Sequence, residues 1–317
     1  MITKTGQEVC AAVLIMREVV KKVRRHYLAD GLNLHAPGGS LYALVGRSGS
    51  GKTAALKLCA GMMDPDSGTV LINGLSMHDR ENRKKRSRLI GYMDEINSSY
   101  PNLHVIEYLE FYSHVYGFYG LSARERCLEL LWMAGLERKA DTLLVNLSES
   151  AQRQLEFLRT LIHHPPLLLL DNPFDKMATQ ERQLTQEIMS RLAAEGTTIV
   201  LTSSSIPHVL DFCHNIGLIE EGRMLAEGTR DEVMRKIRES APLYMEIRSG
   251  QEKAVQMLYQ NPKVKSLTYD RNYFMVHYSG DQEEEVQLLK ELIDAGIGVS
   301  SFHRGQGSLE DLASHLS

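Results

Sequence analysis

Eight consecutive residues, GRSGSGKT, could hold the phosphates of a nucleotide. They match the pattern GxxxxGK[ST], in which glycines let successive backbone N–H groups curl around phosphate oxygens. Lys52 would reach the β- and γ-phosphates, and the hydroxyl of Thr53 would hold Mg²⁺. The nucleotide-binding residues that this pattern predicts are Gly46, Arg47, Ser48, Gly49, Ser50, Gly51, Lys52 and Thr53.

A second group suited to metal chemistry follows an apolar run, Leu167–Leu170. Asp171 stands directly after this run and could hold Mg²⁺ through water, so Thr53 and Asp171 are the predicted metal residues. The next residue is Asn172, whose amide cannot accept a proton from an attacking water molecule. The sequence therefore raises the possibility that a nucleotide is bound here without being efficiently cut.

These side chains need a strand, a loop and a helix to position them. The residues Leu41–Val45 predict a short buried strand before the glycine-rich loop, and the segment AALKLCAGMM after it predicts a helix. The N-terminus of that helix would add a positive dipole at the phosphates. Leu167–Leu170 predict a buried parallel strand that ends at Asp171. With these flanks, a glycine-rich turn that matches the pattern by accident is the weaker alternative.

Composition narrows the remaining function classes. A chain of 317 residues has room for one large domain and one small one. A net charge of -4 gives no electrostatic drive toward nucleic acid, and no nucleic-acid partner is expected. No apolar run approaches the roughly 18 residues that cross a bilayer, so any membrane role is expected to be peripheral. The four cysteines show no CxxC spacing, which favours a reducing cytosol and argues against zinc.

Further segments match a known family in order along nearly the whole chain. Taken with the glycine-rich loop, the sequence resembles the ATP-binding subunit of ABC transporters. The resemblance implies an α/β fold: a P-loop NTPase domain of the ABC type with a helical subdomain. The segments that carry it are DPDSGTVLINGLSMHD, RLIGYMDE, YPNLHVIEYLEFYSHVYG, LVNLSESAQRQLEFLRTLIHHPPLLLLDNP and GTTIVLTSSSIPHVLDFCHNIGLIEEGRMLAEGT.

At several functional positions the chain departs from the family's pattern. Glu95 occupies the glutamine position of the Q-loop, and the resemblance implies that it is a nucleotide-binding residue. Asn172 stands at the catalytic glutamate position, Ala178 at the D-loop aspartate and Ser204 at the switch histidine. The family's LSGGQ signature reads LSESA, which comprises Leu147, Ser148, Glu149, Ser150 and Ala151.

The adenine-stacking aromatic of the family is also displaced. Val23 lies near its expected place, and Tyr27 could substitute for it after a shift of register.

The chemistry of these departures predicts weak hydrolysis. Asn172 supplies no general base, and Ser204 is too short to place a donor against the γ-phosphate. Glu149 adds a side chain and a negative charge where glycine would let backbone N–H groups approach phosphate. In this family each composite site joins one chain's P-loop to the other chain's signature. Because both kinds of change lie in one chain, a competent partner could rescue neither site fully, and no catalytic residue is intact.

The domain organisation follows from a change of pattern late in the chain. Residues 1–238 are predicted to form the ABC-type domain, with its helical subdomain at about 97–160, and residues 239–317 a second domain. Alternating strands and helices in the order βαββαβ, followed by a short helix over 308–317, predict a small ferredoxin-like α+β fold. It resembles the C-terminal domain of many ABC exporter ATPases, where SLED recurs near the end. Dimer contact is the favoured role for this domain, and small-molecule sensing is the rival.

The resemblance implies an ATP-binding subunit of an ABC transporter of the export class that uses ATP and Mg²⁺. Its partners would be a separate membrane permease, docked on residues from Tyr100 to Tyr112, and a second ABC ATPase subunit in a homodimer or heterodimer. Its place would be cytoplasmic, peripheral at the inner face of the cell membrane. The alternative is a non-catalytic, nucleotide-gated regulatory or assembly subunit of a membrane complex. An unrelated P-loop kinase or GTPase is disfavoured, because no NKxD motif occurs.

Overall fold

The structure, a computed structural model, describes residues 12–94 and 100–305 and divides into two compact units. The first runs up to Glu227 and the second begins at Gly228. This division comes earlier than the one expected between residues 238 and 239, so helix α8 (Arg230–Ser240) belongs to the second unit. Arg304 donates hydrogen bonds to the carbonyls of Glu239 and Ala241, which ties the end of α8 to that unit.

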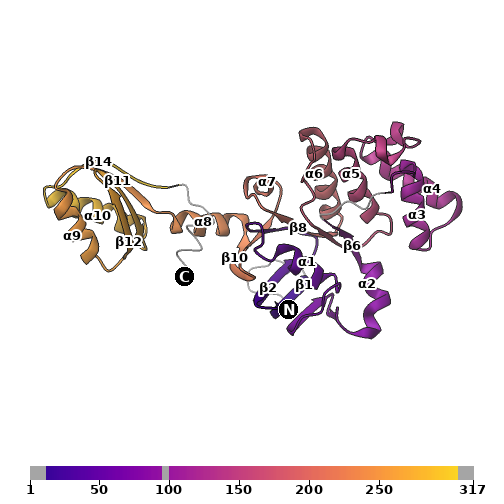
Figure 1. Cartoon of the computed structure of the whole chain (residues 1–317), viewed down its shortest axis with the longest axis horizontal. Helices are drawn as coiled ribbons and strands as arrows, with labels where there is room; N and C mark the ends of the chain where they lie inside the picture. The colour runs from indigo at the N-terminus through magenta and orange to yellow at the C-terminus, as the bar shows by residue number, and fades with distance from the viewer. Residues whose placement is uncertain (1–11, 95–99, 306–317) are drawn as a thin grey trace, which may run out of the picture. The chain divides into compact units, whose positions relative to one another are not determined.

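A six-stranded sheet in the order β10-β9-β3-β8-β7-β6 forms the centre of the first unit (Figure 1). Its strands are β3 (Leu41–Val45), β6 (Ile90–Met93), β7 (Leu167–Leu170), β8 (Thr198–Ser203), β9 (Asn215–Glu220) and β10 (Arg223–Thr229). β3 pairs in parallel with β8 and β9, and β7 pairs in parallel with β6 and β8. β3 and β7 are buried at every residue, as expected for strands covered on both faces. Both predicted strands are confirmed.

A second, antiparallel sheet in the same unit has the order β2-β1-β4-β5. Its strands are β1 (Ala12–Val23), β2 (His26–Pro37), β4 (Ser67–Ile72) and β5 (Leu75–Ser76). Helix α1 (Lys52–Cys59) shares one buried apolar core with both sheets, through residues such as Leu56, Leu34 and Leu44. This core fixes the start of α1, and with it the glycine-rich loop.

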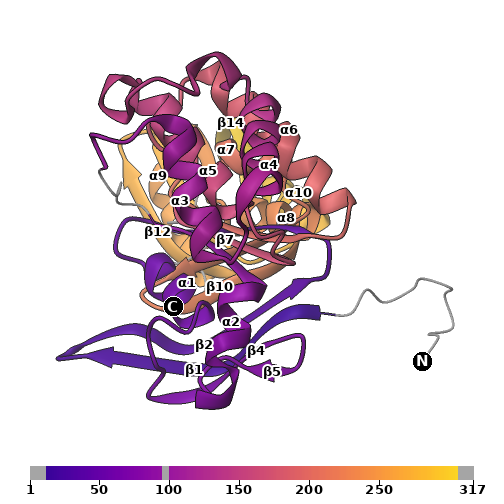
Figure 2. The ribbon, with the colours of Figure 1, turned by 90° about the vertical axis from the view of Figure 1, so that its right-hand side faces the viewer.

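The remaining helices of the first unit are α2 (Arg83–Leu89), α3 (Val105–Val115), α4 (Gly120–Met133), α5 (Glu149–Thr160), α6 (Thr179–Ala194) and α7 (Pro207–Leu210). Of these, α2 lies on the same side of the parallel sheet as α1, and the others lie on the opposite side (Figure 1). Within the segment predicted to be helical, α3 and α4 pack side by side, and both contact α5 (Figure 2). Among the described residues, no helix is both long and apolar enough to span a bilayer.

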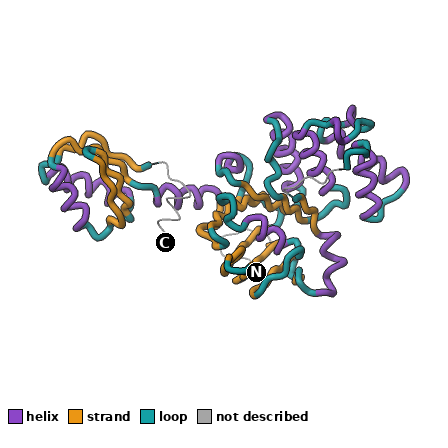
Figure 3. Tube along the Cα trace, viewed as in Figure 1, coloured by secondary structure: helices purple, strands orange, loops and turns teal. Residues whose placement is uncertain are grey.

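The second unit has the predicted βαββαβ order after α8 (Figure 3). Its elements are β11 (Leu243–Ser249), α9 (Gln251–Gln260), β12 (Val264–Asp270), β13 (Tyr273–Tyr278), α10 (Gln282–Asp294) and β14 (Gly298–Arg304). The antiparallel sheet has the order β12-β13-β11-β14, which is the ferredoxin-like arrangement. Asp281 and Glu284 form a capping box that starts α10. The short helix expected over 308–317 lies outside the described residues.

Candidate functional site

The glycine-rich loop connects β3 to α1 in the way the sequence predicts. At its start, the Gly46 N–H donates to the carbonyl of Ser203, which ties the loop to the end of β8. A Cβ atom on Gly46 would lie 2.2 Å from the carbonyl oxygen of Ile219, so only glycine fits there. Gly51 has φ 105°, and a Cβ atom there would lie 2.4 Å from the carbonyl oxygen of Leu28. Both glycines are therefore required by the close approach of neighbouring backbone.

Lys52 closes this loop on itself. Its side chain is almost fully buried, and Nζ donates hydrogen bonds of 2.7 Å to the carbonyls of Gly46 and Arg47. These bonds keep the ammonium group at the mouth of the loop, where it also lines a cavity. Thr53 follows as the second residue of α1 and lines the same cavity. The loop thus presents a cation, a hydroxyl and a helix N-terminus to one space.

This cavity has a volume of about 420 Å³ and joins residues from distant parts of the chain. Asn172, just after β7, and Ser204, just after β8, line it together with Lys52. None of the described residues that line it carries a carboxylate or an imidazole. The lining consists of Leu28, Ser48, Gly49, Gly51, Lys52, Thr53, Ala54, Lys57, Met63, Asn172 and Ser204.

Asp171 is fully buried at the end of β7. Its Oδ1 atom accepts a 2.6 Å hydrogen bond from the hydroxyl of Thr202 on β8. Its Oδ2 atom is buried and has no hydrogen-bond partner among the described residues. A buried carboxylate oxygen left without a donor is costly unless a cation or a bound water satisfies it. Thr53 and Asp171 therefore have the oxygen donors that a hard divalent cation prefers.

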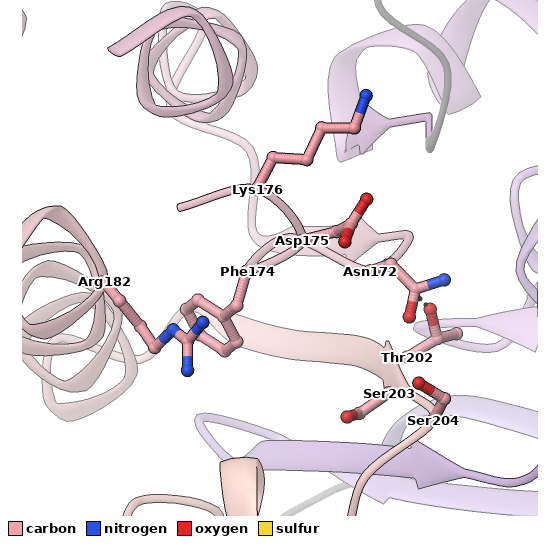
Figure 4. Close-up of a pocket in the computed structure, with 8 residues that line it drawn as sticks. All are labelled: Asn172, Phe174, Asp175, Lys176, Arg182, Thr202, Ser203 and Ser204. Carbon is pink, nitrogen blue, oxygen red and sulfur yellow. Dashed lines mark hydrogen bonds between the residues drawn. The ribbon is translucent and has the colours of Figure 1, made fainter. Parts of the chain in front are cut away.

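Asn172 adopts a left-handed backbone conformation with φ 44°, which asparagine tolerates better than most residues. Its N–H donates a 2.8 Å hydrogen bond to the hydroxyl of Thr202. Asn172 and Ser204 also line a second cavity of about 240 Å³, together with Asp175 and Lys176 from the loop between β7 and α6 (Figure 4). Asn172 and Thr202 lie together there, while the Lys176 side chain points away from them (Figure 4).

Arg153 on α5 is a residue that the sequence did not single out. It is buried, and its guanidinium donates to the carbonyls of Asp94, Asp171 and Asn172 at 2.7, 2.6 and 3.0 Å. It also forms an ion pair of 2.9 Å with Glu156. Arg153 therefore fixes the backbone that carries Asp171 and Asn172. Only the tertiary structure brings that backbone to α5, so the sequence offers no local signal for this role.

The predicted signature residues form the start of α5 and do not line the cavity at the glycine-rich loop. Ser148 caps the helix, because its Oγ accepts a hydrogen bond from the N–H of Ala151. Glu149 is exposed, whereas Leu147 and Ala151 are buried. Ser150 is buried, and its Oγ accepts a 3.0 Å hydrogen bond from the N–H of Ala178 in the D-loop. The serine in place of a signature glycine thus connects two motifs of the same chain.

The sequence also predicted roles for Val23 or Tyr27 in base stacking and for Glu95 in nucleotide binding. Leu28, which the sequence did not single out, lines the cavity, whereas neither Val23 nor Tyr27 does. Glu95 at the Q-loop position lies outside the described residues, so its predicted role stays a prediction.

The segment proposed for permease docking contains a cluster of aromatic rings. Tyr100 lies 5.9 Å from Tyr108 and 6.1 Å from Phe111 between ring centroids, and Tyr100 and Phe111 are partly exposed. The guanidinium of Arg159 lies over the ring of Tyr112. Arg159 also lines a neighbouring cavity of about 500 Å³, with Arg86, Tyr92 and Tyr116 among the other residues around it. Burial, and then the nearby Asp94 and Asp171, raise the pKa of Tyr92 above its usual value, so its phenol stays neutral.

The strand–loop–helix, the parallel sheet and the buried aspartate define a P-loop nucleotide-binding domain. A family model described as ABC transporter matches residues 29–175. The Nod factor export ATP-binding protein I of Burkholderia thailandensis is 33% identical over 217 residues, which cover 68% of this chain and 71% of that protein. The protein of the same name from Burkholderia pseudomallei strain K96243 is 34% identical, with the same coverage.

Two solved structures have the same fold. One, described as the ATP-binding subunit of an ABC transporter, has a TM-score of 0.64 at 23% identity and covers 71% of this chain and 92% of that one. A bacterial ABC transporter cassette solved as a dimer has a TM-score of 0.63 at 25% identity and covers 68% of this chain and 98% of that one. The chain belongs to the ABC transporter family, as an ATP-binding subunit, and the predicted resemblance and fold class are confirmed.

Proposed function

We propose that this chain is the ATP-binding subunit of an ABC exporter and binds Mg²⁺ and ATP at Gly46–Thr53. Backbone N–H groups of the loop and the Lys52 ammonium hold the phosphates, and Leu28 contacts the nucleoside end. Thr53 and Asp171 would hold Mg²⁺, the latter through water, and the buried Oδ2 of Asp171 supports this assignment. The bound ion would neutralise charge on the β- and γ-phosphates. The names of the Burkholderia relatives support export.

We further propose that hydrolysis is weak. The observation that carries this proposal is the lining of the cavity, which includes Asn172 and Ser204. The resemblance sets these two residues at the catalytic glutamate and the switch histidine of the family. An amide cannot take a proton from water, and a serine hydroxyl cannot supply the charge of an imidazolium. Each loss typically costs a factor of about 10² in rate, and the losses need not add.

The proposed partner is a separate membrane permease, which places the chain at the cytoplasmic face of the cell membrane. The aromatic cluster at Tyr100, Tyr108, Phe111 and Tyr112, with its partly exposed rings, supports this docking. Binding of ATP would close a dimer of ATP-binding subunits and so move the permease. The dimeric state of a solved relative supports this pairing, either with a second copy or with another ABC ATPase subunit.

A second candidate is a non-catalytic subunit whose nucleotide occupancy gates or assembles a membrane complex. The same absence of a carboxylate and an imidazole among the described lining residues favours it. The two candidates differ in hydrolysis rather than in binding.

The test combines binding and turnover on one sample. Titration of the purified chain with Mg·ATP should give saturable binding that Lys52→Ala weakens, and phosphate release should be slow, also in the assembled complex. Steady-state turnover of tens per second in the complex, abolished by Lys52→Ala in this chain, would contradict weak hydrolysis. Complete absence of phosphate release with intact binding would favour the gating subunit.

A further inference from the structure

Helix α4 has an apolar row on its outer side in addition to the face that packs into the first unit. Leu121, Leu128 and Trp132 form this row and are 82, 40 and 70% exposed. At 3.6 residues per turn they lie within about 40° of arc, about 135° from the centre of the buried face. Figure 1 shows α4 at the margin of the first unit, beside α3. The buried residues of α4 are Ala123, Cys127, Leu130 and Leu131.

The spacing of the exposed row is that of a coiled-coil seam. Leu128 follows Leu121 by seven residues, and Trp132 follows Leu128 by four, as the inward positions of a heptad repeat do. The fourth position of the same seam lies four residues after Leu121 and is Glu125. We call these four residues the α4 seam. It combines three large apolar side chains, the usual anchors of a protein interface, with one carboxylate.

The carboxylate of the α4 seam is the one that its neighbours leave uncompensated. Arg124 forms an ion pair of 2.7 Å with Glu110 on α3, and Arg126 one of 2.8 Å with Glu129. Glu125 is exposed and forms no hydrogen bond or ion pair with another described residue. An apolar surface that covered the seam would therefore bury this charge without a partner, which is costly. A cation on the covering surface removes that cost.

We propose that the α4 seam binds one amphipathic helix of a partner protein, whose own apolar seam carries a lysine or arginine opposite Glu125. A charged residue within a coiled-coil seam selects the partner and its register. The seam is about 16 Å long, so three turns of the partner helix suffice to cover it. It shares no residue with the nucleotide cavity or with the aromatic cluster assigned to the permease. The inference therefore goes beyond the proposed function.

The charge of Glu125 disfavours two other occupants. Parallel pairing with a second copy of α4 would set two Glu125 side chains opposite each other, and antiparallel pairing would keep them within about one turn. Like charges brought together in one seam oppose association. A lipid surface is disfavoured as well, because the anionic leaflet attracts lysine and arginine rather than carboxylates.

The experiment uses Trp132, the single tryptophan of the chain, as its probe. The full chain is titrated with two synthetic helical peptides of four heptads that lack tryptophan and have leucine at all seam positions but one. That central position is lysine in one peptide and glutamate in the other. The lysine peptide is expected to shift the Trp132 emission to the blue with saturation and to bind about tenfold tighter than the glutamate peptide. Glu125→Lys should reverse this preference.

Two variants show whether the peptide binds at the seam. Leu128→Ser should abolish binding of the lysine peptide, whereas Val145→Ser, at a position that is 61% exposed outside α4, should leave it unchanged. Circular dichroism checks that both variants remain folded. Equal losses in the two variants would contradict the inference, because binding would then not be located at α4.

Other outcomes would also overturn the inference. Absence of a saturable shift, or equal affinity for the two peptides, would remove the selective helix partner. A blue shift on concentrating the chain alone, abolished by Leu128→Ser, would assign the seam to a second copy. A blue shift with vesicles of phosphatidylglycerol and phosphatidylethanolamine would assign it to the membrane. Each of these results leaves Mg·ATP binding untouched, so failure here is distinguishable from failure of the proposed function.

Discussion

The two walls of the cavity at the glycine-rich loop differ in how far they keep the residues of the family pattern. One wall is the loop Gly46–Thr53, with its close-packed glycines, its helix N-terminus and its buried lysine. The other wall carries Asn172 and Ser204 at the ends of β7 and β8, where it offers an amide and a hydroxyl. Adjacent strands of one parallel sheet position both walls. On the proposed function, the scaffold is preserved while the reactive side chains are exchanged, and nucleotide binding and hydrolysis would separate along this boundary.

The largest expected effect tests the second wall directly. Asn172→Glu combined with Ser204→His is expected to raise the rate of phosphate release by about 10²-fold or more, because it returns a general base and a γ-phosphate donor. The rate is measured under saturating Mg·ATP. The matched control is Asn172→Gln with Ser204→His, because glutamine has the length of glutamate but puts no carboxylate at position 172.

If both double variants release phosphate at the wild-type rate, Asn172 and Ser204 do not limit hydrolysis, and the contrast between the two walls fails. The limit would lie instead in the signature residues or the D-loop. The left-handed conformation at position 172 costs glutamate about 1 kcal/mol more than asparagine, which is small beside the expected gain.

The next largest effect is expected from removing Arg153, which holds the backbone that carries Asp171 and Asn172. Arg153→Met is expected to lower the free energy of unfolding by about 3–5 kcal/mol, because it removes the buried ion pair with Glu156 and three hydrogen bonds to backbone carbonyls. Urea unfolding followed by circular dichroism measures the loss. Arg124→Met is the control, since Arg124 forms a more exposed ion pair with Glu110 and its loss should cost at most about 1 kcal/mol. Equal stability of the two variants would refute the role given to Arg153.

The retained wall is tested by comparing two lysines that line the same cavity. Lys52→Ala is expected to weaken Mg·ATP binding by about 10- to 100-fold, because a charged group then no longer bonds the phosphates. Lys57→Ala removes the same charge from the same cavity without disturbing the loop and should change the Kd by less than about threefold. Calorimetric titration distinguishes the two. Similar losses in both variants would mean that the site acts through its net charge alone.

The cavity also shows which site residues can be predicted from the sequence and which cannot. The glycine-rich loop and Asp171 are predictable, because each belongs to a continuous segment whose strand and turn residues lie beside it. Leu28 was missed because β1 and β2 pair with several register shifts between Ala12 and Lys22, so counting along the hairpin does not tell which side chain faces the cavity. Arg153 was missed because its backbone partners come from two segments, the ends of β6 and β7, that only the folded sheet brings together.

The smallest expected effect concerns the serine that replaces a signature glycine. Ser150 accepts a hydrogen bond from Ala178, the N-cap residue of α6, so Ser150→Gly returns the family residue but removes a bond inside this chain. We expect a loss of about 1 kcal/mol in unfolding free energy, with Ser150→Ala losing nearly as much, since alanine keeps the helix but not the acceptor. Nucleotide affinity should stay constant, because Ser150 does not line the cavity. If Ser150→Ala is as stable as the wild type, the hydrogen bond between Ser150 and Ala178 contributes nothing to the free energy of unfolding, which contradicts the role given to this serine.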